Sequence, residues 1–489
     1  MIKSLKNTEW IDLKKGIVGA VLSVMCLIAG CIWLEWYTGL AFALTFLIAG
    51  FVKIDVKSTK WKYIMNLIWG MIIAQVTFQT TFLMIESQYI IKITNYKIFL
   101  NIICLFVVCA IPFFVTTNWK KAIIITSTIM VLISSVNGFI YQFRGKEFGP
   151  MDILSIKTAM NVMGQYSAQI TPRMVQGWIS WLTAVFIQYA LPDLPELPRK
   201  KTRINIVLVE AILILFLYIS TNEITVRTWT DEGTRINGYY LNFYLNFRDS
   251  FVDKPENYSP EKVDEYVSDY TPVDSTAQQR KPNIIVIMDE SFVDFNIFNE
   301  KLRTSAPITP YLDSLSENVI KGYALSSVYG GNTANSEFEF LTGHSLAWLP
   351  DNAVVYQQYI NNKKLYTLTW MLRDYGYKSF ATHPYYETGW SRNRIYPYLG
   401  FEEFTFIDDY PQQKMMRKYV SDQEMFEYVM NKMWYKEPGQ PLFLFGVSMQ
   451  NHGGFDYEGE NFVEDIELLD YSRNYPKAKQ YLNVSNETD

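Results

Sequence analysis

The first 222 residues alternate apolar runs with short polar segments, and this pattern leaves few folds open. A helix needs about 20 apolar residues to cross the hydrocarbon core of a bilayer. No small-residue cleavage signature ends the first run, so we expect a retained span there rather than a signal peptide. The sequence predicts seven spanning helices, near residues 17–34, 38–52, 63–85, 98–117, 121–141, 174–192 and 204–222.

The basic residues of the loops predict the orientation of these helices. Lys and Arg number 14 before the first run and after the second, fourth and sixth runs, against 6 in the intervening loops. Because basic residues accumulate on the cytoplasmic side of a membrane, we expect a cytoplasmic N-terminus. With seven spans, the residues from about 223 onward then lie outside the cell.

Composition argues against some classes of function. The net charge is −5 and the hydrophilic half has no Lys/Arg-rich arm, so we expect no nucleic-acid partner. The hydrophilic half also contains no cysteine and therefore no disulfide. All four cysteines lie in apolar runs: Cys26, Cys31, Cys104 and Cys109.

The sequence divides into three regions. Residues 1–222 form the expected transmembrane domain, residues 223–280 a helical arm with a linker, and residues 281–489 an α/β domain. Within the first region, an apolar stripe fits either a helix lying in the membrane interface or an ordinary packed extracellular helix. The stripe consists of Ile153, Ile156, Ala159 and Val162.

In the hydrophilic half, short apolar strands alternate with helical patterns, which is typical of a mainly parallel sheet flanked by helices. Strands are expected at 283–288, 377–382 and 442–449, and helices at 361–375 and 422–435. Ligands of such sheets collect at the carboxyl ends of the strands, so the polar residues found there predict one shared pocket. Those residues are Asp289, Glu290, His383, Asn451 and His452.

Two residues near the start of this half are candidates for the chemistry itself. Glu290 has the carboxylate that hard cations prefer, although it could equally be a first-turn acid of a helix, and Asp289 competes for the same role. Thr333, in a Gly-Gly-Asn-Thr turn, could be a nucleophile activated by a metal or a helix N-cap, and the two roles are compatible.

Further candidates could hold a substrate. His383 and His452 each follow a strand and fit contact with substrate or metal, or a structural role; His344 is the third histidine. Trp390 and Arg392 could clamp a phosphate and its organic tail, because guanidinium pairs with phosphate oxygens. An arginine of an ordinary surface loop is the alternative for Arg392.

These motifs occur in an order that resembles a known family. NIIVIMDESF, TPYL, GGNTANSEFEF, H-x6-WSR and NHGG follow one another as in the lipoteichoic acid synthase and phosphoglycerol transferase branch of the alkaline phosphatase and sulfatase superfamily. The resemblance covers roughly residues 225–489. It implies an extracellular sulfatase-like domain on a multispan anchor in a bacterial plasma membrane.

The resemblance also implies roles for single residues. Glu290 looks like a metal ligand, and Thr333 like the metal-bound nucleophile that forms a phosphoglycerol-threonine intermediate. The metal would be Mn, with Mg or Zn as alternatives. The headgroup pocket would consist of His383, Trp390, Arg392 and His452.

The sequence departs from the family pattern in two places. The sulfatase motif C-x-P-x-R is absent, which argues against sulfate ester hydrolysis. No Asp-His dipeptide follows Glu290, although the family takes two more metal ligands from such a pair. We therefore expect a C-terminally truncated chain with an incomplete sheet, which leaves open that the polypeptide as given is inactive.

The sequence thus predicts a membrane-anchored transferase. It would move glycerol phosphate from phosphatidylglycerol onto a glycolipid-linked, lipoteichoic acid-like polymer, next to the lipid bilayer. Two alternatives stay open: a phosphoethanolamine transferase of the same superfamily, and a catalytically incomplete protein that binds an envelope polymer.

Overall fold

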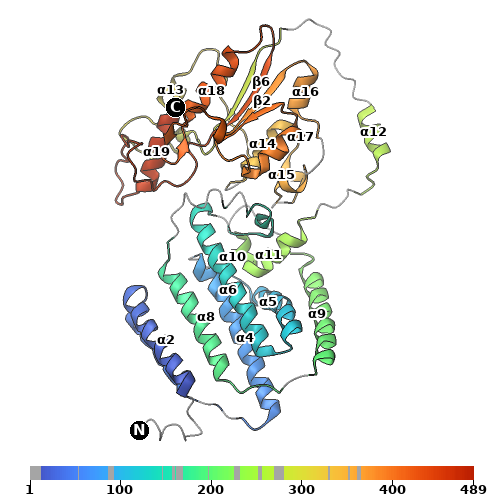
Figure 1. Ribbon diagram of the computed structural model, residues 1–489, viewed down its shortest axis with the longest axis vertical. Helices are drawn as coiled ribbons and strands as arrows, with labels where there is room; N and C mark the ends of the chain where they lie inside the picture. The colour runs from blue at the N-terminus through green and yellow to red at the C-terminus, as the bar shows by residue number, and fades with distance from the viewer. Residues whose placement is uncertain are drawn as a thin grey trace. The chain divides into compact units, whose positions relative to one another are not determined.

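The fold divides into two compact units, Met1–Pro150 with Ala168–Asp249, and Met151–Ser167 with Ser250–Asp489 (Figure 1). The computed structural model describes residues 13–52, 54, 56–85, 93–145, 147–156, 160, 169–195, 198–224, 232–251, 256–268, 280–328, 331–350, 353–360 and 365–489. The two units are taken separately below.

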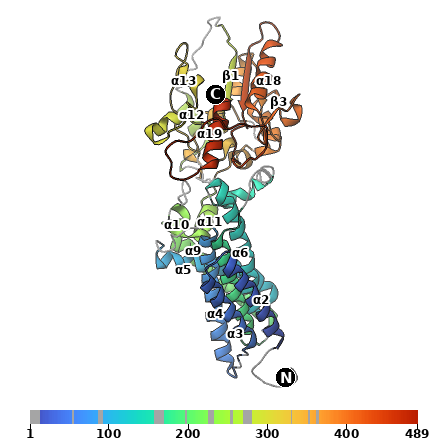
Figure 2. The same ribbon diagram turned by 90° about the vertical axis from the view of Figure 1, so that its left-hand side faces the viewer.

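The first unit has a helix at each of the seven places that the apolar runs predict. These are α2 (Leu13–Ile32), α3 (Trp36–Phe51), α4 (Thr59–Met84), α5 (Asn95–Thr116), α6 (Trp119–Arg144), α8 (Pro172–Ala190) and α9 (Arg199–Thr221) (Figure 2). Five of them, α2, α4, α5, α6 and α9, are long and apolar enough to cross a membrane. The other two are α3, with only 16 residues, and α8, which carries Gln176 and Gln188.

Close backbone contacts and buried polar groups join these helices. A Cβ on Gly30 would lie 2.9 Å from the Cα of Gly39, so α2 and α3 approach as only small residues allow. Helix α4 packs against α6 and α8. Gln188 of α8 donates to Asn66 Oδ1 of α4 over 2.7 Å, which joins two buried amides across the helices.

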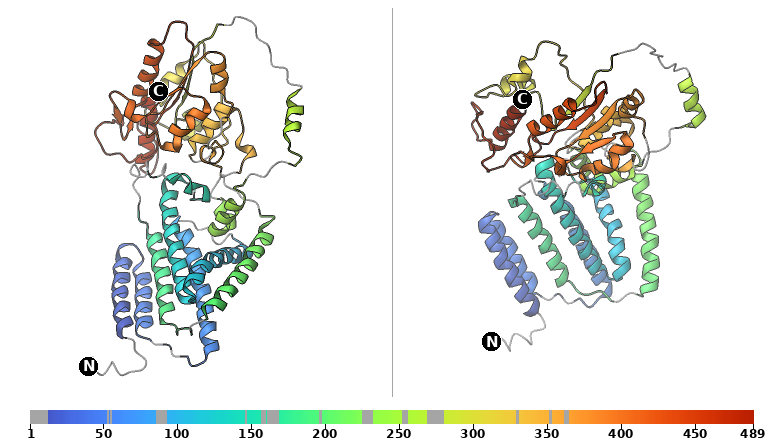
Figure 3. Two further views of the ribbon diagram at one scale, coloured as in Figure 1. Left: turned by 45° about the vertical axis from the view of Figure 1, so that its right-hand side comes forward. Right: turned by 45° about the horizontal axis from the view of Figure 1, so that its top comes forward.

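Part of the expected arm belongs to this unit. Its helices are α10 (Glu232–Asn237) and α11 (Tyr239–Arg248) (Figure 3). Tyr240 and Leu241 of α11 are buried among residues of α4 and α5. Asn101 holds the start of α11, because its side chain accepts from Leu241 N and donates to Asn237 O.

The second unit contains the parallel sheet that the sequence predicts. Four parallel strands lie in the order β1 (Ile284–Met288), β6 (Leu442–Val447), β2 (Lys378–Thr382) and β3 (Glu403–Thr405). A short antiparallel pair consists of β4 (Met415–Met416) and β5 (Tyr419–Val420). The α-helices are α12 (Pro260–Ser268), α13 (Pro310–Ser314), α14 (Thr333–Thr342), α15 (Val355–Gln358), α16 (Leu368–Asp374), α17 (Arg392–Leu399), α18 (Asp422–Trp434) and α19 (Pro476–Thr488). The 3-10 helices are η2 (Pro150–Ile153), η3 (Phe295–Lys301), η4 (Leu346–Trp348), η5 (Gly389–Ser391) and η6 (Ile407–Asp409).

Strand β6 is the centre of this core, and all six of its residues are buried. Because side chains alternate along a strand, Phe443 and Phe445 pack on one face with α14 and α17, while Leu442 and Leu444 pack on the other with Val429 of α18. Met288 of β1 lies opposite Val447 of β6. The segments that follow these two strands therefore leave the sheet side by side.

Three of the sequence-based expectations lie partly outside the described residues. Of the apolar stripe, Ile153 ends η2, whereas Ala159 and Val162 are not described. The expected helix 361–375 appears as α16, and 361–364 are not described. The same holds for most of the linker, residues 269–279.

A pair of glycines gives a test of this packing. Gly400 ends α17 with φ +100°, and a Cβ there would lie 3.0 Å from the ring of Trp370. Gly439 has a similar φ of +81° with no atom within 4 Å of a Cβ. We expect Gly439→Ala to cost roughly 1–2 kcal/mol through backbone strain alone. Gly400→Ala should lower the stability, measured by thermal unfolding, clearly more than Gly439→Ala does. An equal loss of stability in the two variants would contradict the contact with Trp370.

Candidate active site

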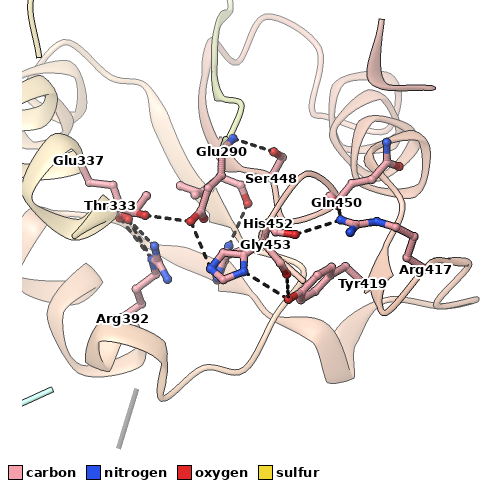
Figure 4. Close-up of polar contacts among 12 residues, drawn as sticks. Glu290, Thr333, Glu337, Arg392, Arg417, Tyr419, Ser448, Gln450, His452 and Gly453 are labelled. Atoms are coloured by element: carbon pink, nitrogen blue, oxygen red, sulfur yellow. Dashed lines mark hydrogen bonds and ion pairs between the residues drawn. The ribbon is translucent and has the colours of Figure 1, made fainter. Parts of the chain in front are cut away.

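The site begins with a direct hydrogen bond between the ends of two distant segments. Thr333 Oγ1 donates to Glu290 Oε1 over 3.0 Å (Figure 4). Glu290 follows β1, and Thr333 is the first residue of α14. The structure thus brings together the two residues that the sequence singles out for the chemistry.

Ser448, the residue directly after β6, fixes the position of Glu290. The backbone N–H of Glu290 donates to Ser448 Oγ over 2.9 Å, and the Ser448 hydroxyl donates to Asp289 Oδ1 over 2.7 Å. The neighbouring carboxylates therefore diverge: Asp289 faces Ser448, while Glu290 faces Thr333. Glu290 lies in a turn, not in the first turn of a helix, so the helix-acid alternative is wrong.

The turn before α14 determines how Thr333 is presented. Gly331 and Asn332 both have positive φ, +105° and +64°, and Asn332 occupies the N-cap position. The chain thereby turns sharply and exposes the hydroxyl of the first helical residue. Asn332, not Thr333, takes the N-cap position, and the Thr333 hydroxyl donates to a carboxylate, so the N-cap alternative for Thr333 is wrong as well.

His452 completes the group around Glu290. Its Nε2 lies 3.8 Å from Glu290 Oε1, and its Nδ1 lies 3.2 Å from the hydroxyl of Tyr419 (Figure 4). That hydroxyl donates to Gly453 O over 2.9 Å, which leaves its oxygen to accept from Nδ1–H. Arg417 holds the same loop by donating to the carbonyls of Gln450, His452 and Gly454.

His383 is buried directly after β2. Its Nδ1 lies 2.9 Å from Val447 O, and because a carbonyl only accepts, Nδ1 carries the proton and Nε2 a lone pair. Burial, with the charges of Arg392 and His452, lowers the pKa of His383 well below its usual value. The ring is therefore a neutral acceptor, suited to a hydroxyl group of a substrate.

Arg392 is not a surface residue. Its side chain is 2% exposed and forms an ion pair with Glu337, to which Nε donates over 3.1 Å. Trp390 is partly buried against the core, with φ +53°. His344, by contrast, is exposed and makes an edge contact with Phe338.

Sequence reasoning missed four residues of this site: Glu337, Arg417, Tyr419 and Ser448. Only Glu337 had a visible signal. It follows Thr333 by four residues, and in a helix that spacing puts both on one face. Arg417 binds backbone carbonyls, and Ser448 binds both the backbone N–H of Glu290 and the carboxylate of Asp289. No local pattern in the sequence marks these contacts.

The site offers a divalent cation oxygen ligands of a suitable type, but only a small number of them. The oxygens of Glu290 and Thr333 converge, and carboxylate and hydroxyl oxygens suit hard cations. Among the described residues, no group of three or more His, Cys, Asp or Glu side chains is placed to hold a metal. Since a metal site takes about three protein ligands, this pair alone would be an incomplete ligand set.

Two acids lie next to the site, Asp289 half-buried and Asp422 fully buried. Burial raises the pKa of Asp289 to about 6. Burial and the charge of Asp289 raise the pKa of Asp422 to about 7. Thr488 of α19 donates to Asp422 Oδ2 over 2.7 Å, whereas Oδ1 has no hydrogen-bond partner among the described residues.

Asp422 makes stability depend on pH. Its folded-state pKa, about 7, exceeds the unfolded value near 3.9, so its contribution is fully present below about pH 4 and is lost as pH rises to about 7. We expect Asp422→Asn to leave stability unchanged near pH 4 and to raise it at pH 8. Denaturant unfolding at both values tests this, with the exposed Asp408→Asn as control. Equal stability of Asp422→Asn and the unmodified protein at pH 8 would contradict it.

A known protein family matches the C-terminal part of the chain. Residues 282–489 match the family described as Sulfatase. This part of the chain therefore resembles a sulfatase domain. The expected fold class, a helical membrane region followed by a sulfatase-like α/β domain, is thereby confirmed.

Several curated proteins resemble the chain. A Rhizobium meliloti protein named for cyclic beta-1,2-glucan modification is 29% identical over 293 residues, which cover 58% of this chain and 44% of that protein. The lipoteichoic acid synthase of Staphylococcus aureus is 26% identical over 182 residues, which cover 36% of this chain and 27% of the synthase. The chain spans less than half the length of these relatives.

Among solved structures, the chain is similar to the Streptococcus pyogenes phosphoglycerol transferase GacH in complex with sn-glycerol-1-phosphate. The identity is 21% and the TM-score 0.40, over 48% of this chain and 64% of GacH. The lipoteichoic acid synthase LtaP of Listeria monocytogenes is 20% identical with a TM-score of 0.35, over 42% of this chain and 49% of LtaP.

Proposed function

We propose that this protein is a membrane-anchored transferase that moves glycerol phosphate from phosphatidylglycerol onto a cell-envelope polymer. The observation that carries the proposal is the hydrogen bond from Thr333 to Glu290 at the carboxyl end of β1. Two kinds of relative support it, one named for lipoteichoic acid synthesis and one for glucan modification. In this proposal the N-terminus is cytoplasmic and the sulfatase-like domain extracellular.

The first half-reaction would form a covalent intermediate on Thr333. Its oxygen attacks the phosphorus of the donor, the bond from phosphorus to the diacylglycerol oxygen breaks, and diacylglycerol leaves as an alcohol. Glu290 is placed to take the Thr333 proton, because its Oε1 already accepts that hydrogen. His452 Nε2, 3.8 Å from the same oxygen, is placed to carry a proton toward the leaving alcohol.

In the second half-reaction a hydroxyl group of the polymer attacks the same phosphorus, and Thr333 leaves with its proton restored. The proton of the acceptor hydroxyl returns to Thr333 by the reverse path, through His452 Nε2 and Glu290, so that Glu290 ends as a carboxylate, as microscopic reversibility requires. A divalent cation held by Glu290 and Thr333, with Mn expected and Mg or Zn as alternatives, would favour the threonine alkoxide and offset the charge on phosphorus. Its remaining ligands would have to come from groups other than those described.

The pocket around this pair would hold the headgroup. Arg392 would supply positive charge for the phosphate, and the neutral His383 would accept from a glycerol hydroxyl. Trp390, two residues before Arg392, would pack against the glycerol carbons. His383 lies at the carboxyl ends of β2 and β6, directly after β2 and in contact with Val447 O.

A donor competition experiment tests the proposed substrate. The protein in vesicles is given phosphatidylglycerol with a labelled headgroup, Mn and a glycan acceptor, and unlabelled phosphatidylethanolamine is added in excess. We expect the label to enter the acceptor at an undiminished rate. Strong inhibition, with transfer of phosphoethanolamine instead, would favour the alternative donor. Polymer binding without any transfer would favour the non-catalytic alternative.

A further inference from the structure

Thr333 shares helix α14 with a buried acid that has no role so far. Glu337 is 0% exposed and lies one turn after Thr333, on the same face of the helix. It receives hydrogen bonds from Arg392 Nε, from the Tyr356 hydroxyl over 3.0 Å and from the Tyr396 hydroxyl over 3.2 Å. All of its partners are themselves buried.

The ion pair between Glu337 and Arg392 is bidentate. Both Nε and Nη2 of Arg392 donate to the carboxylate, which fixes the plane of the guanidinium as well as its position (Figure 4). These two nitrogens form one edge of the group. Nη1 is the guanidinium nitrogen that Glu337 does not engage.

A buried ion pair is a costly way to gain stability, because both charges lose their hydration. The arrangement is easier to explain if the arginine must be held in one orientation. Burial acts to lower the pKa of Arg392, but the charges of Glu337 and Glu290 outweigh it and raise the pKa. The guanidinium is thus charged and within electrostatic reach of the Glu290–Thr333 pair.

We infer that Glu337 is a positioning residue for anion binding: it holds the Arg392 guanidinium by two hydrogen bonds so that Nη1 stays available to a phosphate oxygen beside Thr333. Thr333 and Glu337 lie on one face of one helix, so α14 sets the distance between the nucleophile and the anion-binding arginine. This inference deepens the proposed function but needs only that the site bind a phosphate.

The sign of the effect on anion binding distinguishes positioning from simple electrostatics. Replacing Glu337 by glutamine removes a negative charge near the site, which by charge alone would tighten the binding of an anion. If Glu337 positions Arg392, the same change frees the guanidinium and weakens binding. Isothermal titration of the protein in detergent with sn-glycerol phosphate, and separately with inorganic phosphate, measures this directly.

We expect Glu337→Gln to weaken the binding of both probes at least about tenfold, which corresponds to about 1.4 kcal/mol. Glu337→Asp, which keeps the charge, should recover part of the loss. In an Arg392→Gln background, Glu337→Gln should have little further effect, because its role passes through the arginine. The matched control is Glu339→Gln, which removes a charge from the same helix at a carboxylate that accepts from Leu346 N.

Three results would overturn the inference. One is unchanged or tighter binding in folded Glu337→Gln or, if that variant does not fold, unchanged binding in Glu337→Asp. A second is a loss that adds fully to that of Arg392→Gln. The third is the absence of phosphate binding in the unmodified protein. Failure of the proposed function would give a different result. Phosphate would still bind, Glu337→Gln would still weaken that binding, and no glycerol phosphate would be transferred.

Discussion

Thr333→Ala is expected to reduce the transfer of glycerol phosphate on the order of 10³-fold or more. The substitution removes the oxygen that attacks phosphorus, and no other described hydroxyl donates to Glu290. The fold should persist, because Thr333 is only partly buried and its neighbour Asn332 takes the N-cap position. Release of label from phosphatidylglycerol in vesicles measures the rate, and thermal unfolding checks the fold.

Thr333→Ser is the matched variant, since it keeps a hydroxyl at the same atom. We expect it to retain a measurable fraction of the rate, well above that of Thr333→Ala. A Thr333→Ala protein that transfers at more than a tenth of the normal rate would exclude Thr333 as the nucleophile. If Thr333→Ala does not fold, the transfer rate of Thr333→Ser alone would be compared with that of the unmodified protein.

Glu290→Gln is expected to cost roughly 10²- to 10⁴-fold in rate, the usual contribution of a positioned base. Glutamine can still accept the hydrogen bond from Thr333, so the geometry should survive. It cannot take the proton, and it is a poorer cation ligand than a carboxylate. The rate of label transfer, measured at saturating phosphatidylglycerol, should therefore fall with little change in unfolding temperature.

Glu403→Gln is the control for this prediction. Glu403 is 53% exposed and pairs with Lys432 on the surface, a contact that contributes little. Its substitution should leave the rate unchanged within about twofold, a margin of less than 1 kcal/mol. If Glu290→Gln behaved like Glu403→Gln, Glu290 would have no part in the reaction.

The sequence predicted the sheet well because its strands are short apolar runs with polar ends. β1, β2 and β6 all appear within two residues of their expected bounds. Parallel pairing then brings Asp289, Glu290 and His452 to one edge, as the strand-end argument requires. The apolar helices were equally visible, because each predicted run appears as a helix; among the described residues, five of these helices are long and apolar enough to cross a membrane.

The sequence could not predict which contacts close the site. The ion pair of Glu337 and Arg392 joins residues 55 positions apart, and neither periodicity nor spacing marks it. The left-handed conformation of Asn332, which settles whether Thr333 caps its helix, depends on the surrounding packing. Likewise, the Ser448 hydroxyl accepts from the backbone N–H of Glu290 and donates to the carboxylate of Asp289, so the two carboxylates point in different directions. The sequence around the two acids does not show this difference.

The most direct test of the central claim is to trap the intermediate. The protein is incubated with headgroup-labelled phosphatidylglycerol and Mn without acceptor, quenched in acid, and its peptides are mapped by mass spectrometry. We predict one glycerol phosphate group on Thr333 and none on Thr333→Ala. A covalent label on a different residue, or label that persists in Thr333→Ala, would contradict the account.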